Sequence, residues 1–145
     1  MIDKKELRIG NIVNYTINNV EGGVTIQRGV ITSLTESRAI VNGKSIKYCN
    51  LNPIKIDEDL LLKLRFTKCF HDILNEYYYK LILNGFCIDI NKYSNTLGRD
   101  YGIHIDNLCC DSVLSGDIQY LHQLQNYIYD STHQELDVSM LLKNK

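Results

Sequence analysis

Five cysteines and four histidines are the side chains of this chain best suited to covalent chemistry. Cys69 or Cys110 beside an imidazole could act as a thiol nucleophile with its general base. The candidate bases are His71, His104 and His122. A chain with this many cysteines and histidines offers such pairs by chance. The sequence also holds no Gly-x-Ser-x-Gly, phosphate-binding glycine loop or His-Glu-x-x-His, so we predict that the protein is not an enzyme.

The spacing of the same residues argues against a metal centre. No Cys-x-x-Cys pair occurs, and Cys69-x-His71 is the only close couple of the two residue types. Vicinal Cys109-Cys110 is not a spacing that structural zinc sites use. Acidic side chains that could bind a metal are more often solvated surface residues, and here they are Asp100, Asp106 and Asp111. We therefore expect no metal, no cofactor and free thiols.

The polar loop 91–102 has the composition of a recognition segment, with cations, aromatic faces and small hydrogen-bonding groups. Arg99 could grip a phosphate or carboxylate through two hydrogen bonds while Tyr93 or Tyr101 stacks on the ligand. The alternative is an ordinary surface loop whose arginine is solvated. The candidate binding residues, which include one histidine from outside the loop, are Lys92, Tyr93, Asn95, Arg99, Tyr101 and His122.

A predicted helix over 117–132 carries two polar side chains at unusual positions. Leu124 and Ile128 share its apolar arc at about 100° per residue. Gln125 falls inside this arc and His122 at its edge. A buried amide without partners costs about 1–3 kcal/mol. Either both side chains hydrogen-bond a strand edge or loop beneath the helix, which is the commoner case, or they point into a ligand pocket.

Two motifs at opposite ends of the chain resemble those of one protein family. Residues 6–11 read Glu-Leu-Arg-Ile-Gly-Asn, and residues 122–126 read His-Gln-Leu-Gln-Asn, with Glu-Leu at 135–136. In these motifs, and in a Leu-Leu-Lys helix followed by Phe66, the chain is similar to small uncharacterised proteins of gut bacteria, their mobile elements and their phages. Arg65 stands where that pattern leads us to expect glycine. The resemblance implies a bacterial or phage protein and no particular activity.

The net charge of −1 is unevenly distributed along the chain. Residues 1–56 carry eight Lys/Arg against four Asp/Glu, a net charge of +4, whereas residues 57–145 carry eight against thirteen, a net charge of −5. One interpretation is an N-terminal module that faces nucleic acid. The other is electrostatic complementarity between the halves or between protomers. The basic residues available for nucleic acid are Arg8, Arg28, Arg38, Lys44 and Lys47.

Turn patterns divide residues 1–56 into short strands. Asn-Gly at 42–43 predicts a tight hairpin, and Gly29 predicts a bulge or bend within a long second strand. A last strand is expected at 54–56, after the only proline. Five short strands with a bent second strand predict an SH3-like small β-barrel.

Residues 57–145 are expected to form a second unit. Asp57 can cap a helix, and Asn84-Gly85 predicts a hairpin between two strands. Further strands are expected over 101–105 and 108–114. The predicted fold class is therefore α+β: an SH3-like small barrel, then a small antiparallel sheet packed by one or two helices.

Tyrosine is the compositional oddity, with ten against three phenylalanines and no tryptophan. Tyrosine buries area while keeping a polar end, which suits interfaces. The run Tyr77-Tyr78-Tyr79 must place side chains on both faces of a strand. We therefore expect a homo-oligomer, most simply a dimer, with part of this run at or near the contact.

These observations predict a non-enzymatic binding protein of phage or mobile-element type. It would modulate host defence by engaging a host factor or by sequestering a small nucleotide-like signal. A cytoplasmic location is expected, because the sequence has no apolar run of membrane-spanning length and no signal-peptide pattern. The alternatives are a nucleic-acid-binding module that uses the basic barrel and a structural virion component.

Overall fold

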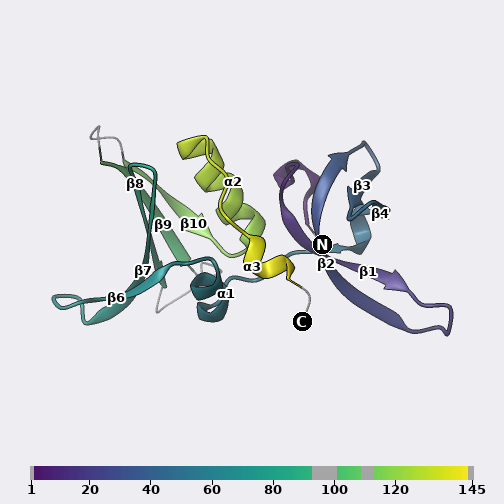
Figure 1. Ribbon diagram of the computed structural model, residues 1–145, viewed down its shortest axis with the longest axis horizontal. Helices are drawn as coiled ribbons and strands as arrows, with labels where there is room; N and C mark the ends of the chain where they lie inside the picture. The colour runs from purple at the N-terminus through teal and green to yellow at the C-terminus, as the bar shows by residue number, and fades with distance from the viewer. Residues whose placement is uncertain (1, 93–100, 109–112, 144–145) are drawn as a thin grey trace. The chain divides into compact units, whose positions relative to one another are not determined.

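A computed structural model describes residues 2–92, 101–108 and 113–143 (Figure 1). The chain divides into two compact units. Unit 1 comprises Met1–Lys55 with Tyr120–Asn126, and unit 2 comprises Ile56–Gln119 with Tyr127–Lys145. Each unit contains a five-stranded antiparallel sheet accompanied by short helical segments, so the fold is mixed α+β. Among the described residues, no helix is both long enough and apolar enough to cross a membrane.

The sheet of unit 1 has the strand order β4-β3-β2-β1-β5. Two short 3-10 helices, η1 (Lys4–Glu6) and η2 (Tyr48–Asn50), lie before β1 and between β4 and β5. The strands are β1 (Ile12–Asn18), β2 (Val24–Leu34), β3 (Arg38–Val41), β4 (Lys44–Lys47) and β5 (Leu51–Asn52).

One hydrophobic cluster of buried residues lies within unit 1. Tyr15 is the largest of its buried side chains, and its hydroxyl donates a hydrogen bond of 2.8 Å to the Gln27 side-chain oxygen, so its polar end is satisfied. The cluster takes residues from all five strands and from the segment before β1: Ile2, Leu7, Val13, Tyr15, Ile31, Ala39, Val41, Ile46 and Leu51.

The long strand β2 is irregular, as the sequence predicts, but the irregularity lies further along. The β2–β3 register shifts between Ile31 and Ser33. Gly29 instead makes room for the Asn42 side chain, since an added Cβ would lie 2.6 Å from the Asn42 Cγ. That amide accepts from and donates to the β2 backbone, so it ties the β3–β4 turn to β2.

Both Asn-Gly hairpins are confirmed. Asn42 and Gly43 have φ of 50° and 76°, and Asn84 and Gly85 have φ of 43° and 88°. Positive φ at both central residues belongs to the type I′ turn, whose twist matches that of paired strands.

The last strand of unit 1 is not at 54–56, so that prediction is wrong. β5 consists of Leu51–Asn52 and pairs antiparallel with β1. It ends before Pro53, which has no N–H to donate to a ladder. Beyond it, Lys55 forms only an isolated bridge with Tyr120.

The sheet of unit 2 has the strand order β10-β9-β8-β7-β6. Its first strand comes from a segment whose sequence favours neither helix nor strand. The five strands are β6 (Thr67–His71), β7 (Glu76–Leu83), β8 (Phe86–Lys92), β9 (Tyr101–Asn107) and β10 (Val113–Ile118).

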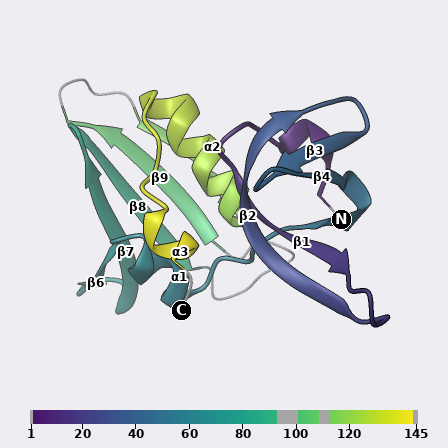
Figure 2. The same ribbon diagram turned by 45° about the vertical axis from the view of Figure 1, so that its right-hand side comes forward.

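One face of this sheet is apolar and the other polar, as alternation along each strand requires. The ladder places Tyr79, Ile90 and Ile103 in one buried cross-strand row. Helix α2 (Leu121–Thr132) contributes Tyr127 to unit 2, where its ring packs on Gly116. A Cβ at Gly116 would lie 2.6 Å from that ring, so the absence of a side chain lets helix and strand approach closely. Figure 2 shows α2 from a second angle.

The structure corrects two boundaries near α2. The helix begins at Leu121 rather than at residue 117, and β10 runs over 113–118 rather than within 108–114. Asp117 therefore pairs with Gly102 in the sheet and does not cap the helix. Ser-Gly-Asp at 115–117 has the composition of a turn, but β9 offers this segment a full antiparallel ladder.

Helix α1 (Glu58–Lys63) has both ends defined by hydrogen bonds. The Asp57 carboxylate accepts from the Leu60 N–H at 2.8 Å, which confirms the predicted cap. At the other end, the Phe66 N–H donates to the Leu61 carbonyl at 3.0 Å. This is the Schellman arrangement, and it places Arg65 at φ 71°, a left-handed conformation that glycine adopts without strain. A further short helix, α3 (Ser139–Leu142), lies near the C-terminus.

Replacing Arg65 with glycine should therefore stabilise the protein. We expect Arg65→Gly to raise the free energy of unfolding by about 0.5–1 kcal/mol, because it removes the cost of a left-handed non-glycine residue. The side chain itself contributes little, since its 3.7 Å contact with Asp137 is exposed on both sides. Urea denaturation measures the change, with Arg65→Ala as the control that keeps the strain. Equal stability of the two variants would contradict this account.

Candidate functional site

The sequence motifs at 6–11 and 122–126 meet in unit 1. Gln125 is buried, and its side-chain oxygen accepts from the Ile12 N–H at 2.9 Å. Its amide nitrogen donates to the Gly10 carbonyl at 3.0 Å. Both partners are backbone groups at the start of β1. This is the arrangement expected if Gln125 hydrogen-bonds a segment beneath the helix.

Asn126 binds the same segment through side chains. Its oxygen accepts from the Asn11 amide at 2.8 Å and from the Arg8 Nε at 3.2 Å, and its nitrogen donates to the Glu6 carbonyl. Asn11 is itself buried and accepts from the Arg8 N–H at 2.7 Å. We call this set the polar knot: Glu6, Arg8, Gly10, Asn11, His122, Gln125 and Asn126.

His122 is the remaining member of the knot. Its Nε2 lies 3.0 Å from the Glu6 carboxylate, and its ring stacks on that of Tyr120, with centroids 5.9 Å apart. The side chain is almost fully buried, and its Nδ1 has no hydrogen-bond partner among the described residues. His122 belongs to unit 1, whereas two other predicted binding residues, Lys92 and Tyr101, belong to unit 2.

Substitution of Gln125 tests the knot. Gln125→Leu should lower the free energy of unfolding by about 2–5 kcal/mol, because it leaves the buried Ile12 N–H and the part-buried Gly10 C=O unpaired, and a fully buried unpaired group costs about 1–3 kcal/mol. Gln123→Leu is the control on the same helix. The half-buried Gln123 side chain accepts from the Tyr120 N–H at 3.1 Å, and the loss of this hydrogen bond should cost about 1 kcal/mol. Thermal and urea unfolding would show the difference. Equal losses would refute the helix-face assignment.

The predicted recognition loop is only partly visible. Tyr93, Asn95 and Arg99 lie outside the described residues. Lys92 and Tyr101 are directly opposite each other in the β8–β9 ladder, so these two predicted site residues do come together.

Lys92 and Tyr101 line a hollow of about 490 Å³, which we call the tyrosine hollow. Tyr77 and Tyr79 reach it from β7, because alternate residues of a strand share a face. The remaining lining residues come from β6, β7 and the start of α1, and they are Asp57, Glu58, Lys68 and Glu76.

The charges in the tyrosine hollow are partly neutralised inside it. Lys68 lies 2.7 Å from the Glu58 carboxylate and 4.5 Å above the centre of the Tyr77 ring. The hydrogen bond that Lys68 donates to Glu58 raises the pKa of Lys68. Burial is the first cause, and the Glu58 charge the second, that raises the pKa of Tyr79. Lys68 is therefore an ammonium and Tyr79 a neutral phenol at physiological pH. Lys92 has no ion pair within the described residues.

The two tyrosines of the hollow should differ in their contribution to stability. Tyr79 is 6% exposed and Tyr77 57% exposed. Tyr79→Ser should therefore cost about 3–5 kcal/mol of unfolding free energy, as for other large buried aromatics. Tyr77→Ser should cost less than about 1 kcal/mol. Chemical denaturation of both variants decides this, and a severe loss with Tyr77→Ser would show that Tyr77 is a core residue.

The polar face of the same sheet places Ser115, His104 and Asp89 in one cross-strand row. The order matches a Ser-His-Asp triad, but no hydrogen bond joins these three side chains. Two shallow hollows of about 300 and 320 Å³ share Asn91 and His104 on this face. Ser115, His104 and Asp89 therefore do not make, in this structure, the nucleophile–base contact by which such a triad is recognised.

Two of the described cysteines make local contacts with their neighbours in the sheet of unit 2. Cys69 donates to the Thr67 carbonyl, and Cys87 to the Asp89 carboxylate. Burial, ahead of the Asp89 charge, raises the pKa of the Cys87 thiol, which opposes thiolate formation. Across residues 2–92, 101–108 and 113–143, no three His, Cys, Asp or Glu side chains form a cluster that could hold a metal ion. Cys110 lies outside these residues.

The basic residues of unit 1 do not form one patch. Arg38 and Lys47 are directly opposite each other in the β3–β4 ladder. Lys44 is opposite Val41, on the other face by alternation. Arg28 lies opposite Asn14 and donates to its side chain at 3.4 Å, and Arg8 is held in the polar knot.

Sequence reasoning missed Glu58, Lys68 and Glu76 as parts of the hollow. The available pattern was the alternation of Tyr77 and Tyr79, which predicts a shared face but not what lies beside it. Comparison with known proteins adds nothing to the site, because no family model, curated protein or solved structure matches the chain.

Proposed function

We propose that this chain is a non-enzymatic binding protein that engages a partner protein through the tyrosine hollow. The observation that carries the proposal is the meeting of the exposed Tyr77, backed by the buried Tyr79 and Tyr101, with lysines and carboxylates around one hollow of unit 2. Tyrosine supplies contact area together with a hydrogen-bonding end, at low conformational cost. Flanking charges of both signs favour a protein surface with its own mixed charges.

A nucleotide-like signal fits the hollow less well. Three carboxylates, of Asp57, Glu58 and Glu76, face two ammonium groups, and Lys68 is already paired with Glu58. Phosphate recognition needs a local excess of cationic donors, which here leaves Lys92 alone among the described lining residues. Sequestration of a nucleotide is therefore the second candidate, supported by the exposed ring of Tyr77, on which a base could stack.

The likeness of the two motifs to small phage and mobile-element proteins supports a host factor as the partner. A cytoplasmic protein that binds a component of host defence is one concrete form of this proposal. The structural virion role has no specific observation in its favour.

For unit 1 we propose an SH3-like small barrel as scaffold. Three features support it: the bent β2, the 3-10 helix η2 between β4 and β5, and the return of β5 to pair with β1. A nucleic-acid role for this unit would rest on Arg38 and Lys47. Such binding would weaken steeply with added salt through counterion release, which separates it from protein binding at the hollow.

Affinity capture from host cells with the wild-type chain and a hollow variant tests the proposal. Tyr77→Ser combined with Lys92→Glu should weaken capture of the partner about thirtyfold, since an interface tyrosine typically contributes about 2 kcal/mol or more. The matched control is Ile82→Ser, because Ile82 is as exposed as Tyr77 but lies on the opposite face of β7.

Two outcomes would overturn the protein-partner proposal. One is a partner that the double variant retains at full affinity in a titration. The other is a stoichiometric nucleotide in mass spectra of the supernatant after the purified protein is heat-denatured, which would instead establish the second candidate.

A further inference from the structure

We propose that Asn84 is a site of spontaneous deamidation, whereas Asn42, in the equivalent turn of unit 1, is protected from the same reaction. The inference does not rest on the proposed partner. Both residues precede glycine, in the two Asn-Gly pairs of the chain. Asparagine is a thermolabile residue, and a glycine after it leaves the attacking backbone nitrogen sterically open because glycine has no Cβ.

The reaction consumes only water. The Gly85 backbone nitrogen attacks the side-chain carbon Cγ of Asn84, the Cγ–Nδ2 bond breaks, and ammonia leaves with the proton of the attacking nitrogen. The product is a cyclic imide. Water then opens this ring at one of its two carbonyl carbons. Attack at Cγ gives aspartate, and attack at the main-chain carbon gives isoaspartate, whose main chain runs through Cγ.

The geometry of both turns must change before this attack. In a type I′ turn, Cβ of the first central residue points away from the following backbone nitrogen, so Cγ cannot reach that nitrogen. Each turn therefore has to open locally, and such openings differ in free energy from one part of a protein to another. The contacts that hold each asparagine in place consequently decide which of the two reacts.

Asn42 is held by its side chain. Its oxygen accepts from the Val30 N–H at 3.3 Å, and its nitrogen donates to the Arg28 carbonyl at 3.2 Å. Its Cγ also packs over Gly29, only 2.6 Å from the position that a Cβ would occupy there. Strand β2 therefore covers one side of the carbon that must be attacked, and both hydrogen bonds must break before this carbon can rotate.

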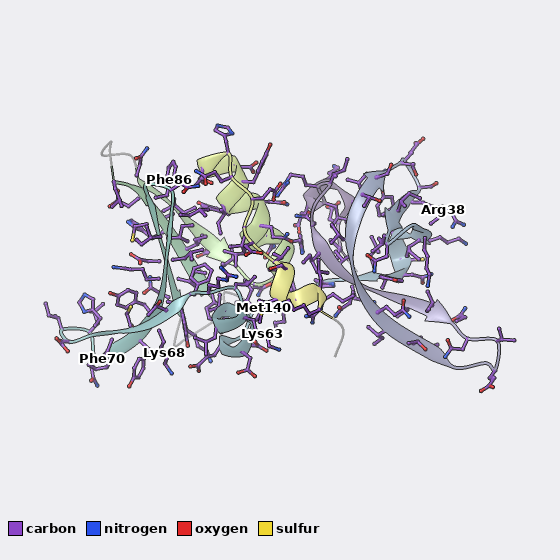
Figure 3. The ribbon with its side chains drawn as sticks, viewed as in Figure 1. Arg38, Lys63, Lys68, Phe70, Phe86 and Met140 are labelled. Carbon is purple, nitrogen blue, oxygen red and sulfur yellow. The ribbon has the colours of Figure 1, made fainter. Side chains whose placement is uncertain are left out.

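Asn84 is held by a single side-chain contact. Its nitrogen donates to the Gln134 side-chain oxygen, and its own oxygen has no hydrogen-bond partner among the described residues. A Cβ added at Gly85 or at Gly43 would meet nothing within 4 Å, so the two turns differ at the asparagine and not at the glycine. Figure 3 labels Phe86, which follows the Asn84 turn at the start of β8.

Deamidation at Asn84 would alter the β7–β8 hairpin. Isoaspartate adds a carbon to the main chain of a two-residue turn, which the type I′ geometry does not accommodate. The Gly85 carbonyl, which accepts from the Leu108 N–H at 2.9 Å, would then be displaced. Either product carries a carboxylate in place of the amide that donates to Gln134. Each conversion also adds one negative charge to the net charge of −1.

Peptide mapping of the full chain tests the proposal. The protein is incubated at mildly alkaline pH and physiological temperature, once native and once in guanidinium chloride. Trypsin then releases the two asparagines on separate peptides, 39–44 and 81–92, and fragmentation in the mass spectrometer separates Asn84 from Asn91. Folding should slow the reaction of Asn42 at least about fivefold more than that of Asn84, because one more hydrogen bond must break.

Two substitutions should act on one site each. Gln134→Ala removes the contact of Asn84 and should speed its deamidation about fivefold, without changing the rate at Asn42. Gly29→Ala places a Cβ against Cγ of Asn42, so it should speed the reaction at Asn42 alone. Asn84→Gly has no amide to lose and adopts positive φ without strain. Aged samples of this variant should keep the stability that aged wild-type protein loses.

Three results would overturn the inference. One is equal slowing of the two reactions by folding, and another is faster conversion of Asn42 than of Asn84 in the native protein. The third is a native protein in which neither asparagine reacts over a period that converts both in guanidinium chloride. A rate at Asn84 that Gln134→Ala leaves unchanged would refute the role given to the Gln134 contact.

Discussion

The amide side chains of Gln125 and Asn126 are the interaction on which unit 1 depends. They satisfy backbone groups of Glu6, Gly10 and Ile12, in the segment that leads into β1. A backbone N–H or C=O removed from water must be paired, so burial of this segment requires these donors and acceptors. The residues concerned are more than 110 positions apart in the chain. A fragment ending at Lys55 would keep every strand of the unit 1 sheet. It would lack the side-chain amides that allow the segment leading into β1 to be buried.

Unit 2 uses its polar and aromatic side chains differently. Tyr79 is buried against the apolar face of the sheet. Tyr77, two residues earlier on β7, remains exposed at the surface. The Glu58–Lys68 pair joins the start of α1 to β6 and contributes little stability because it is exposed. Its effect is to organise the rim of the tyrosine hollow. The same short strand β6 therefore supplies a side chain to the hollow on one face and an unpaired backbone edge to its surroundings.

Local chemistry accounts for what the sequence could predict. The two Asn-Gly turns and the Asp57 cap follow from preferences that act within four residues, and the helical period placed Gln125 on the buried face. Ser115-Gly116-Asp117 forms part of a strand because a ladder with β9 overrides its turn-like composition. The partners of Gln125 and the meeting of Glu58 with Lys68 depend on tertiary contacts. A single sequence holds no local pattern for these, and the residues at the centre of the predicted loop lie outside the described structure.

The polar knot also has a consequence for synthesis on the ribosome. Domains at the N-terminus usually fold first as the chain emerges, at about 5–20 residues per second. Here all five strands of unit 1 leave the tunnel some seventy residues before Gln125, a delay of about 4–14 s at that rate. During this interval the backbone of Gly10 and Ile12 must stay hydrated, so the nascent sheet waits in an open form. A chaperone that binds the nascent chain during this interval would meet the open form and not a finished domain. A premature stop codon in this stretch would release the chain in the same open form.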